Sequence, residues 1–270
     1  ERSFGAAGVL GFYDTERNEL VVRAGEVTPF ARTVLVHELT HALDDQLFEL
    51  YRPEYDDADD EIGFGLSAVA EGNARRVENA FRNTLSVEEQ REALREEARY
   101  GSGLSLDKFT LSYLMLQLAP YEYGLQFVEQ LVASGGEAAV DAALQDPPRT
   151  SEQVLDFNAW RSNEPRTEVP APPADGPIVE DGVVGQVAIE AVLIAAVHPG
   201  TASDAAEGWA GDWFVAWKQG SASCIRVAFV METARDRAEL RDALGEWVEE
   251  MERAELTESG DQLTLTSCVG

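Results

Sequence analysis

A 21-residue stretch, TPFARTVLVHELTHALDDQLF (28–48), predicts one long helix near the start of the chain. Thr28 is a favoured N-cap residue and Pro29 suits the first helical position, so the helix is expected to begin there and end near Phe48. Most of the remaining residues in this stretch are uncharged. We therefore expect this helix to be buried.

Further elements are expected on both sides of this helix. Two β-prone runs, 8–13 and 19–23, surround a short polar connection and predict a hairpin before it. Ser86 and Glu89 form a capping box that predicts a helix start. Apolar spacing and such start signals predict helices after the first one at 65–84, 86–100, 107–118, 121–134 and 137–144.

The chain changes character after a proline-rich stretch. Five prolines fall within 163–182, which predicts a linker. Four of the five tryptophans follow it. The elements expected beyond it are helices at 183–197 and 234–252 and strands at 212–218, 223–231 and near 262–268. The fold class is expected to be α+β, with a mainly helical domain over 1–162 and an α+β domain over 183–270.

The charge balance limits the partners. The chain has 50 acidic and 21 basic residues and a net charge of −29, which disfavours binding to nucleic acid and to anionic membranes. Only two of the basic residues are lysines, a composition that favours a salt-adapted surface; the alternative is an acidic protein from an arginine-favouring genome. The most apolar run, 183–197, contains Gln186 and Glu190, so no membrane-spanning segment is expected.

The two cysteines, Cys224 and Cys268, fall in β-like stretches and could form a cross-strand disulfide. A secreted protein would form this bond, whereas a cytosolic one would keep two thiols. The chain begins at Glu1 with no signal peptide, as a mature or truncated form would. We expect an extracellular or cell-surface location. The oligomeric state does not follow from the sequence.

The chemistry-bearing motif is His37-Glu38-Leu39-Thr40-His41. Residues four apart on a helix project from one face, so both imidazoles can reach one metal ion at about 2.0–2.1 Å. Glu38 points about 100° around the helix, where its carboxylate can take a proton from a water on that metal. This is the division of labour of His-Glu-x-x-His zinc hydrolases. The alternative is a histidine pair held by hydrogen bonds at a surface.

A catalytic zinc site needs a third protein ligand. The best candidate is Glu71, because a carboxylate in an apolar segment needs a partner, and its small neighbours would let its helix approach the first closely. An exposed helix glutamate is the alternative reading. Asp59, in the acidic run 56–61, and the remaining histidine, His198, are weaker candidates.

Supporting groups are also suggested by position. Asp44 or Asp45 could hold a ring N–H of a ligand histidine, and Tyr121 could donate to a developing oxyanion. Arg75, one turn after Glu71, is either a transition-state donor or a salt-bridge partner. Surface charges and ordinary packing are the alternatives for these residues.

Two segments together resemble the gluzincin metallopeptidases. These are HELTHALDDQ (37–46) and AVAEGNA (68–74), and they are closest to a bacterial and archaeal branch with His-Glu-x-x-His-Ala-Leu-x-Asp-Gln and a later Glu-Gly-Asp-Ala. The stretches 120–124 and 147–153 also resemble that branch, so the resemblance covers about residues 8–155. Asn73 stands where the family usually has aspartate.

The resemblance implies zinc held by His37, His41 and Glu71, with Glu38 as the base. It also implies that the hairpin offers an edge strand to an extended peptide. A gluzincin needs a small sheet before the active-site helix, so either upstream sequence is missing or the strands within 212–231 complete that sheet.

Three functions remain open from the sequence. The first is an active zinc peptidase that cleaves peptides or proteins. The second is a non-proteolytic protein that keeps the zinc site for structure or for binding a partner. The third is a zinc hydrolase acting on another substrate class, such as a small amide.

Overall fold

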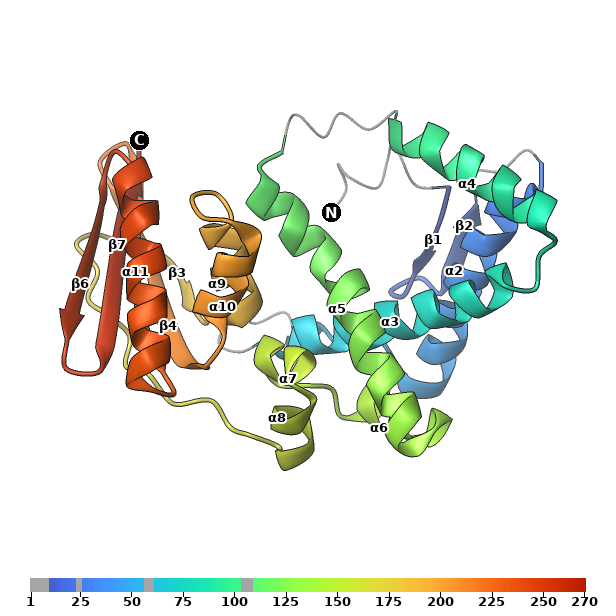
Figure 1. Ribbon diagram of the computed structural model, residues 1–270, viewed down its shortest axis with the longest axis horizontal. Coiled ribbons are helices and arrows are strands. Elements are labelled where there is room, and N and C mark those ends of the chain that lie inside the picture. The colour runs from blue at the N-terminus through green and yellow to red at the C-terminus, as the bar shows by residue number, and fades with distance from the viewer. Residues whose placement is uncertain (1–9, 23–25, 56–60, 103–108) are drawn as a thin grey trace. The chain divides into compact units, whose positions relative to one another are not determined.

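The computed structural model describes residues 10–22, 26–55, 61–102 and 109–270 (Figure 1). The fold class is α+β, as predicted: most elements are helices, and the strands form two antiparallel sheets. The chain divides into two compact units. Unit 1 comprises Glu1–Pro53, Leu66–Thr110 and Pro120–Pro147. Unit 2 comprises Glu54–Gly65, Leu111–Ala119 and Pro148–Gly270.

Unit 1 consists of a β-hairpin and helices. The hairpin pairs β1 (Gly11–Asp14) with β2 (Glu19–Val22), which confirms the predicted hairpin over the described residues. The helices that contribute to this unit are α2 (Pro29–Phe48), α3 (Ile62–Arg82), α4 (Val87–Ser102), α5 (Leu111–Gly135) and α6 (Glu137–Gln145).

Helix α2 has the predicted bounds and the predicted start. The Thr28 side chain accepts a hydrogen bond from the Ala31 N–H at 3.1 Å. The helix ends where Glu49 adopts a left-handed conformation with φ 55°. The capping box of α4 is likewise present, since Ser86 and Glu89 exchange backbone-to-side-chain hydrogen bonds.

The expectation that α2 is a buried apolar helix was wrong for one face. Leu39, Leu43 and Leu47 are 53%, 56% and 63% exposed. The buried side of the helix is instead mostly polar, and its buried residues are Ala31, Thr33, His37, Glu38, Thr40, Asp44 and Asp45. The helix therefore turns its polar face inward, which has a cost unless those groups find partners.

Helices α3 and α5 cross at two glycines. A Cβ at Gly72 would lie 2.2 Å from the Gly124 carbonyl oxygen, and a Cβ at Gly124 would lie 2.0 Å from the Ala68 carbonyl oxygen. The small residues around Glu71 thus admit the backbone of α5. They were expected to admit the helix that carries the histidines, so this packing partner is a correction.

Helix α5 is one helix where two were predicted. Pro120 lies inside it, and the expected break at 118–121 does not occur. A proline removes one backbone donor and can be accommodated by a kink without ending a helix. Residues from Pro120 onward belong to unit 1 and the preceding turns to unit 2.

Unit 2 contains a five-stranded antiparallel sheet of order β3-β4-β5-β7-β6. Its strands are β3 (Ile178–Gly182), β4 (Trp209–Gln219), β5 (Ala222–Met231), β6 (Ala254–Ser259) and β7 (Gln262–Val269). This sheet is separate from the β1–β2 pair. The C-terminal strands therefore do not complete the sheet of the hairpin.

The apolar core of unit 2 lies between one face of this sheet and three helices. These helices are α9 (Gln186–Leu193), α10 (Pro199–Ala206) and α11 (Ala234–Glu250). Leu193 and Leu240 pack against Trp209 and Phe229 in this core. Short helices that the sequence did not predict, α7 (Ser151–Leu155), α8 (Phe157–Ser162) and the 3-10 turn η1 (Pro53–Tyr55), precede the sheet along the chain.

The proline-rich stretch, expected to be a linker, belongs to unit 2. The Thr167 N–H donates to the Ala210 carbonyl at 2.6 Å, and the Arg226 guanidinium donates to the Pro173 carbonyl. Its last residues form the edge strand β3. Backbone hydrogen bonds to the sheet thus order a segment whose composition alone suggested a free connection.

A disulfide joins Cys224 to Cys268, which are directly paired residues of β5 and β7. The predicted cross-strand bond is therefore present. Trp217 and Ala222 pack beside Cys224 in a small apolar cluster.

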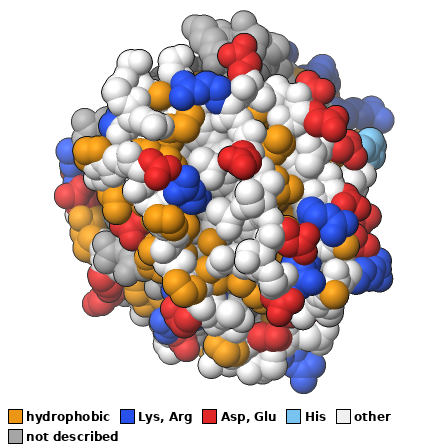
Figure 2. All heavy atoms as spheres, turned by 90° about the vertical axis from the view of Figure 1, so that its left-hand side faces the viewer, with side chains coloured by type: hydrophobic (Ala, Val, Ile, Leu, Met, Phe, Trp, Pro, Cys, Tyr) orange, Lys and Arg blue, Asp and Glu red, His pale blue; other side chains and the backbone are white. Residues whose placement is uncertain are grey.

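The surface on the side of this sheet mixes charges of both signs with apolar side chains (Figure 2). Arg237 on α11 shows the pattern, because it pairs with Glu258 and Asp261 at 3.1 and 2.7 Å. Among the described residues, no helix has the length and apolar character needed to cross a membrane.

Candidate metal centre

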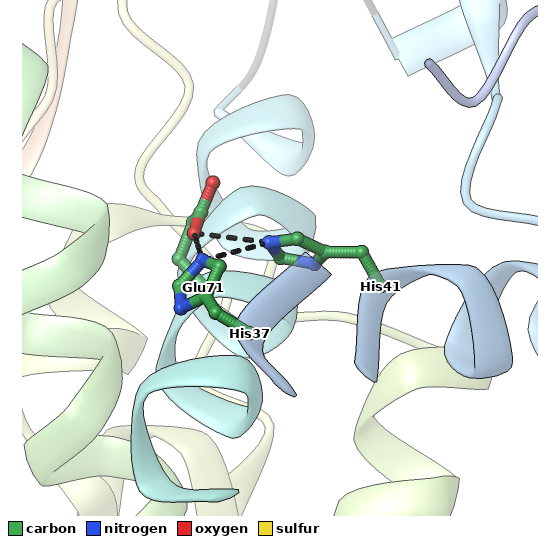
Figure 3. A group of neighbouring side chains, drawn as sticks. All are labelled: His37, His41 and Glu71. Carbon is green, nitrogen blue, oxygen red and sulfur yellow. Dashed lines mark hydrogen bonds and ion pairs between the residues drawn. The ribbon is translucent and has the colours of Figure 1, made fainter. Parts of the chain in front are cut away.

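His37, His41 and Glu71 come together from two helices of unit 1 (Figure 3). His37 Nε2 lies 3.2 Å from Glu71 Oε2, and His41 Nε2 lies 3.3 Å from the same oxygen. The two Nε2 atoms are 3.1 Å apart. One oxygen and two nitrogens, all of ligand type, therefore form a nearly equilateral triangle.

This triangle has the size that a tetrahedral zinc ion requires. Ligands at about 2.0–2.1 Å in tetrahedral geometry are separated by about 3.3–3.4 Å. The observed separations of 3.1–3.3 Å are close to that value. Two imidazoles and one carboxylate also form a ligand set that leaves the fourth position of a catalytic zinc site for water. The residues present thus fit zinc in both geometry and chemistry.

Glu38 lies beside the triangle and is held through one oxygen. Its Oε2 accepts a hydrogen bond from the Tyr13 backbone N–H at 2.8 Å, which connects the helix to β1. Oε1 accepts no hydrogen bond from the part of the chain that the structure describes. Burial raises the pKa of Glu38, although the neighbouring charges of His41 and His37 oppose this change. One oxygen is thus fixed and the other is available to a water.

Tyr121, near the middle of α5, reaches the same site. Its ring stacks on that of His37 with centroids 6.2 Å apart. Burial raises the pKa of Tyr121 well above its usual value, and the charge of Glu71 and a hydrogen bond to Glu71 add to this effect. The phenol therefore stays protonated beside the Glu71 carboxylate.

Neighbouring charges shift the pKa values of His37 and Glu71 in the triangle. Burial lowers the pKa of His37, but the adjacent carboxylates of Glu71 and Glu78 outweigh this effect and raise that pKa to about 9. Burial raises the pKa of Glu71, but hydrogen bonds from His37 and His41 outweigh it and lower that pKa to about 2. The carboxylates around His37 thus favour its protonated, positively charged form.

Asp44 and Asp45 were suggested to hold a ring N–H of a ligand histidine, but the structure shows other partners for both. The Asp44 carboxylate accepts from the Asn73 side-chain amide at 2.8 Å. The Asp45 carboxylate accepts from the Tyr13 hydroxyl at 2.8 Å and from the Leu50 N–H at 2.9 Å. Asn73 therefore serves as a donor that links α3 to α2.

The group nearest to the other nitrogen of His37 is Glu78, which sequence reasoning missed. Its Oε2 lies 3.3 Å from His37 Nδ1 and 3.2 Å from Nη1 of Arg75. Arg75 is thus a salt-bridge partner of Glu78. Glu78 lies seven residues after Glu71, two turns along the same helix face, and this spacing is the signal that could have identified it.

Of the weaker ligand candidates, His198 is not part of this group. His198 caps the N-terminus of α10 in unit 2, where its Nδ1 accepts from the Gly200 N–H at 3.2 Å. Among the described residues, the triangle is the group of three or more ligand-type side chains that could hold a metal ion. Asp59 lies outside the described residues.

One family model matches part of the chain. Residues 174–267 match a model described as Domain of unknown function (DUF8575). This region lies in unit 2 and includes none of the residues of the metal centre. No curated protein and no solved structure matches the chain.

Proposed function

We propose that unit 1 is a zinc-dependent hydrolase of peptide bonds, with the metal held by His37, His41 and Glu71. The observation that carries the proposal is the triangle of ligand atoms, with separations of 3.1–3.3 Å, on a helix that buries its polar face. The resemblance of residues 37–46 and 68–74 to gluzincin metallopeptidases supports the same ligand set.

The chain's own residues supply the other requirements of the reaction. A zinc ion bound here would lower the pKa of a water to about 7 and polarise a substrate carbonyl. Glu38 takes the proton of the attacking water on its free Oε1 and returns it to the leaving amine. The Tyr13 N–H keeps this carboxylate in place through Oε2. Tyr121, whose protonated phenol lies beside Glu71 and whose ring stacks on His37, would donate to an oxyanion as charge develops.

The position of β1 favours an extended peptide as the substrate. The Tyr13 N–H points to Glu38, so it lies on the edge of β1 that β2 does not occupy. A peptide added along this edge would be bound by the backbone groups that Glu38 does not engage and would pass beside the base. The same arrangement gives a small amide no comparable anchor, which is why peptides are preferred in this proposal.

The proposal extends to the working environment. The Cys224–Cys268 disulfide supports an oxidising compartment, and thus an extracellular or cell-surface location. The net charge of −29 with two lysines supports a surface adapted to high salt and argues against nucleic acid as a partner.

Glu38→Gln tests the catalytic role. The variant keeps the shape of the side chain and its acceptor for the Tyr13 N–H but cannot take a proton. Hydrolysis of a denatured protein substrate is expected to fall by about 10²–10⁴-fold, while the zinc content stays the same. Glu129→Gln, at an exposed position of α5, is the matched control and should retain activity.

The same experiment separates peptidase from zinc-binding protein. Zinc-loaded wild type that cleaves no peptide or protein would favour the second function, a non-proteolytic protein that uses the site to bind a partner. Full activity in Glu38→Gln would remove Glu38 from the mechanism.

A further inference from the structure

We propose that Glu78 is a positioning residue of the metal centre, which fixes His37 with its proton on Nδ1 and so leaves Nε2 free to bind the metal. The inference deepens the proposed function and rests on it. It assigns a role to a buried carboxylate that neither the motif nor the family resemblance includes.

The geometry places Glu78 and the metal position on opposite sides of one imidazole. His37 Nε2 faces Glu71 Oε2 at 3.2 Å and His41 Nε2 at 3.1 Å. His37 Nδ1 faces Glu78 Oε2 at 3.3 Å. A histidine can bind a metal through one nitrogen while the other donates its proton to a carboxylate, and this second contact selects the tautomer and orients the ring.

The Nδ1 atom of His37 has no partner other than Glu78 among the described residues. Nδ1 of His37 is buried, and it makes no well-aligned hydrogen bond with any of the residues described. Glu78 Oε2 is the carboxylate oxygen recorded at ion-pair distance from it. A small rotation of the imidazole would align the N–H with this oxygen. Binding of a metal ion to Nε2 would favour such a rotation.

The carboxylate of Glu78 is itself held in position. Its side chain is 5% exposed, and it pairs with Arg75 at 3.2 Å through Oε2 and with Arg82 at 2.8 Å through Oε1. Arg82 is tied in turn to Glu97 of α4 at 3.0 Å. The two arginines limit the movement of Glu78, as a group that orients a ligand requires.

The two histidines are supported unequally. The two carboxylates that follow His41 in sequence are engaged elsewhere, Asp44 by Asn73 and Asp45 by Tyr13. The described ion pairs of His41 include Glu71 alone. His37 is therefore the ligand whose orientation depends on a second carboxylate, and Glu78 is the residue to change.

The test is the zinc affinity of the full chain, measured by competition with a chelator of known affinity. Glu78→Gln removes the charge, and Glu78→Asp keeps the charge but withdraws it from Nδ1. Both are expected to weaken zinc binding by about 10–100-fold, the usual cost of losing such a partner. Glu129→Gln, at an exposed position of α5 outside this network, is the control and should bind zinc as wild type does.

A spectroscopic measurement separates positioning from stability. Cobalt(II) in place of zinc should give a shifted visible absorption spectrum in Glu78→Asp, because the His37 ring is reoriented, whereas Glu129→Gln should keep the wild-type spectrum. Circular dichroism shows whether each variant is folded, and Glu78→Asp decides the matter if Glu78→Gln does not fold.

The outcomes are distinct from those that test the proposed function. Wild type that binds no zinc would overturn the proposed function itself. Wild type that binds zinc, with Glu78→Asp binding it equally well and with an unchanged cobalt spectrum, would overturn the role of Glu78 and leave the proposed function standing.

Discussion

The two units use buried polar groups in different ways. In unit 2 these groups satisfy backbone atoms: the Asp212 carboxylate accepts from the N–H groups of Val184 and Gly185, and the Ser151 hydroxyl accepts from the Val187 N–H. In unit 1 the buried ionisable groups face one another, as His37 does with Glu71 and Glu78.

This difference distinguishes buried polar groups that stabilise the fold from those suited to chemistry. A carboxylate that caps a helix start lowers the cost of burying backbone donors. A cluster of histidine and glutamate side chains that contact one another satisfies little backbone, and such clusters are found where a protein binds cations or moves protons. The histidine–glutamate cluster of unit 1 is thus the arrangement in which we propose chemistry.

All five tryptophans lie in unit 2, at 160, 209, 213, 217 and 247. Tryptophan fluorescence therefore reports the unfolding of unit 2, and zinc binding reports the integrity of unit 1. This pair of measurements lets each variant below be assigned to one unit.

Removing the disulfide should have the largest effect on stability. The bond closes a loop of 44 residues, so its loss in Cys224→Ala/Cys268→Ala should lower the free energy of unfolding of unit 2 by about 4 kcal/mol. Denaturant titration followed by tryptophan fluorescence measures this change. Zinc affinity should be unchanged, and a variant that loses both properties would show that the two units are not independent.

Glu61→Gln should change how the stability of unit 2 depends on pH. Burial, with the charges of Asp212 and Glu152, raises the pKa of Glu61 to about 8, although hydrogen bonds from Ser151 oppose this rise. Since the unfolded chain has a lower pKa of about 4.5, the folded state binds the proton more tightly, and stability falls as pH rises from about 4.5 to about 8.

The amide stays neutral and can still accept from the Ser151 N–H. At pH 8 the variant should therefore be more stable than wild type by a few kcal/mol, and at pH 4 the two should be nearly equal. Thermal unfolding at both pH values measures this difference. Glu249→Gln, at an exposed position of α11, is the control. A Glu61→Gln variant with the pH dependence of wild type would contradict the interpretation.

Two helix caps offer a matched pair of smaller changes. Thr28 caps α2 in unit 1, and Thr233 caps α11 in unit 2 through a capping box with Asp236. Replacing either threonine with alanine should cost about 1 kcal/mol. Thr28→Ala should weaken zinc binding without changing the tryptophan transition, and Thr233→Ala should do the reverse. If either variant changed zinc binding and the tryptophan transition equally, the two units would not be independent.

Of these changes, a change in salt concentration should have the smallest effect on stability. Raising the salt concentration from about 0.1 M to about 2 M screens the repulsion within a chain of net charge −29, so the melting temperature should rise by several degrees. Exposed ion pairs such as Arg237–Glu258 are weakened by the same screening but contribute little. A melting temperature that falls or does not change would argue against a salt-adapted surface.

Local signals account for what the sequence predicted well. Thr28 and Pro29 set the start of α2, and the four-residue spacing of His37 and His41 placed both rings on one face. Glu71 was identified because a carboxylate in an apolar segment needs a partner. These inferences need one helix or one pair of helices and no knowledge of the rest of the fold.

The missed features depend on contacts between distant segments. The edge strands β3 and β6 carry few apolar residues, and pairing with β4 and β7 defines them. Gly72 of α3 faces α5, which sequence spacing cannot show. Glu78 has ordinary helix neighbours in sequence, and its role follows from its distance to His37.

The most direct test of the central claim is the metal content of the protein purified without chelators or a metal-affinity tag. Elemental analysis should find about one zinc per chain in wild type and a large loss in Glu71→Ala, with the tryptophan unfolding transition of unit 2 unchanged. Wild type that holds no zinc, even after incubation with the ion, would contradict the account, because the triangle of His37, His41 and Glu71 would then be a hydrogen-bonded cluster and not a metal centre.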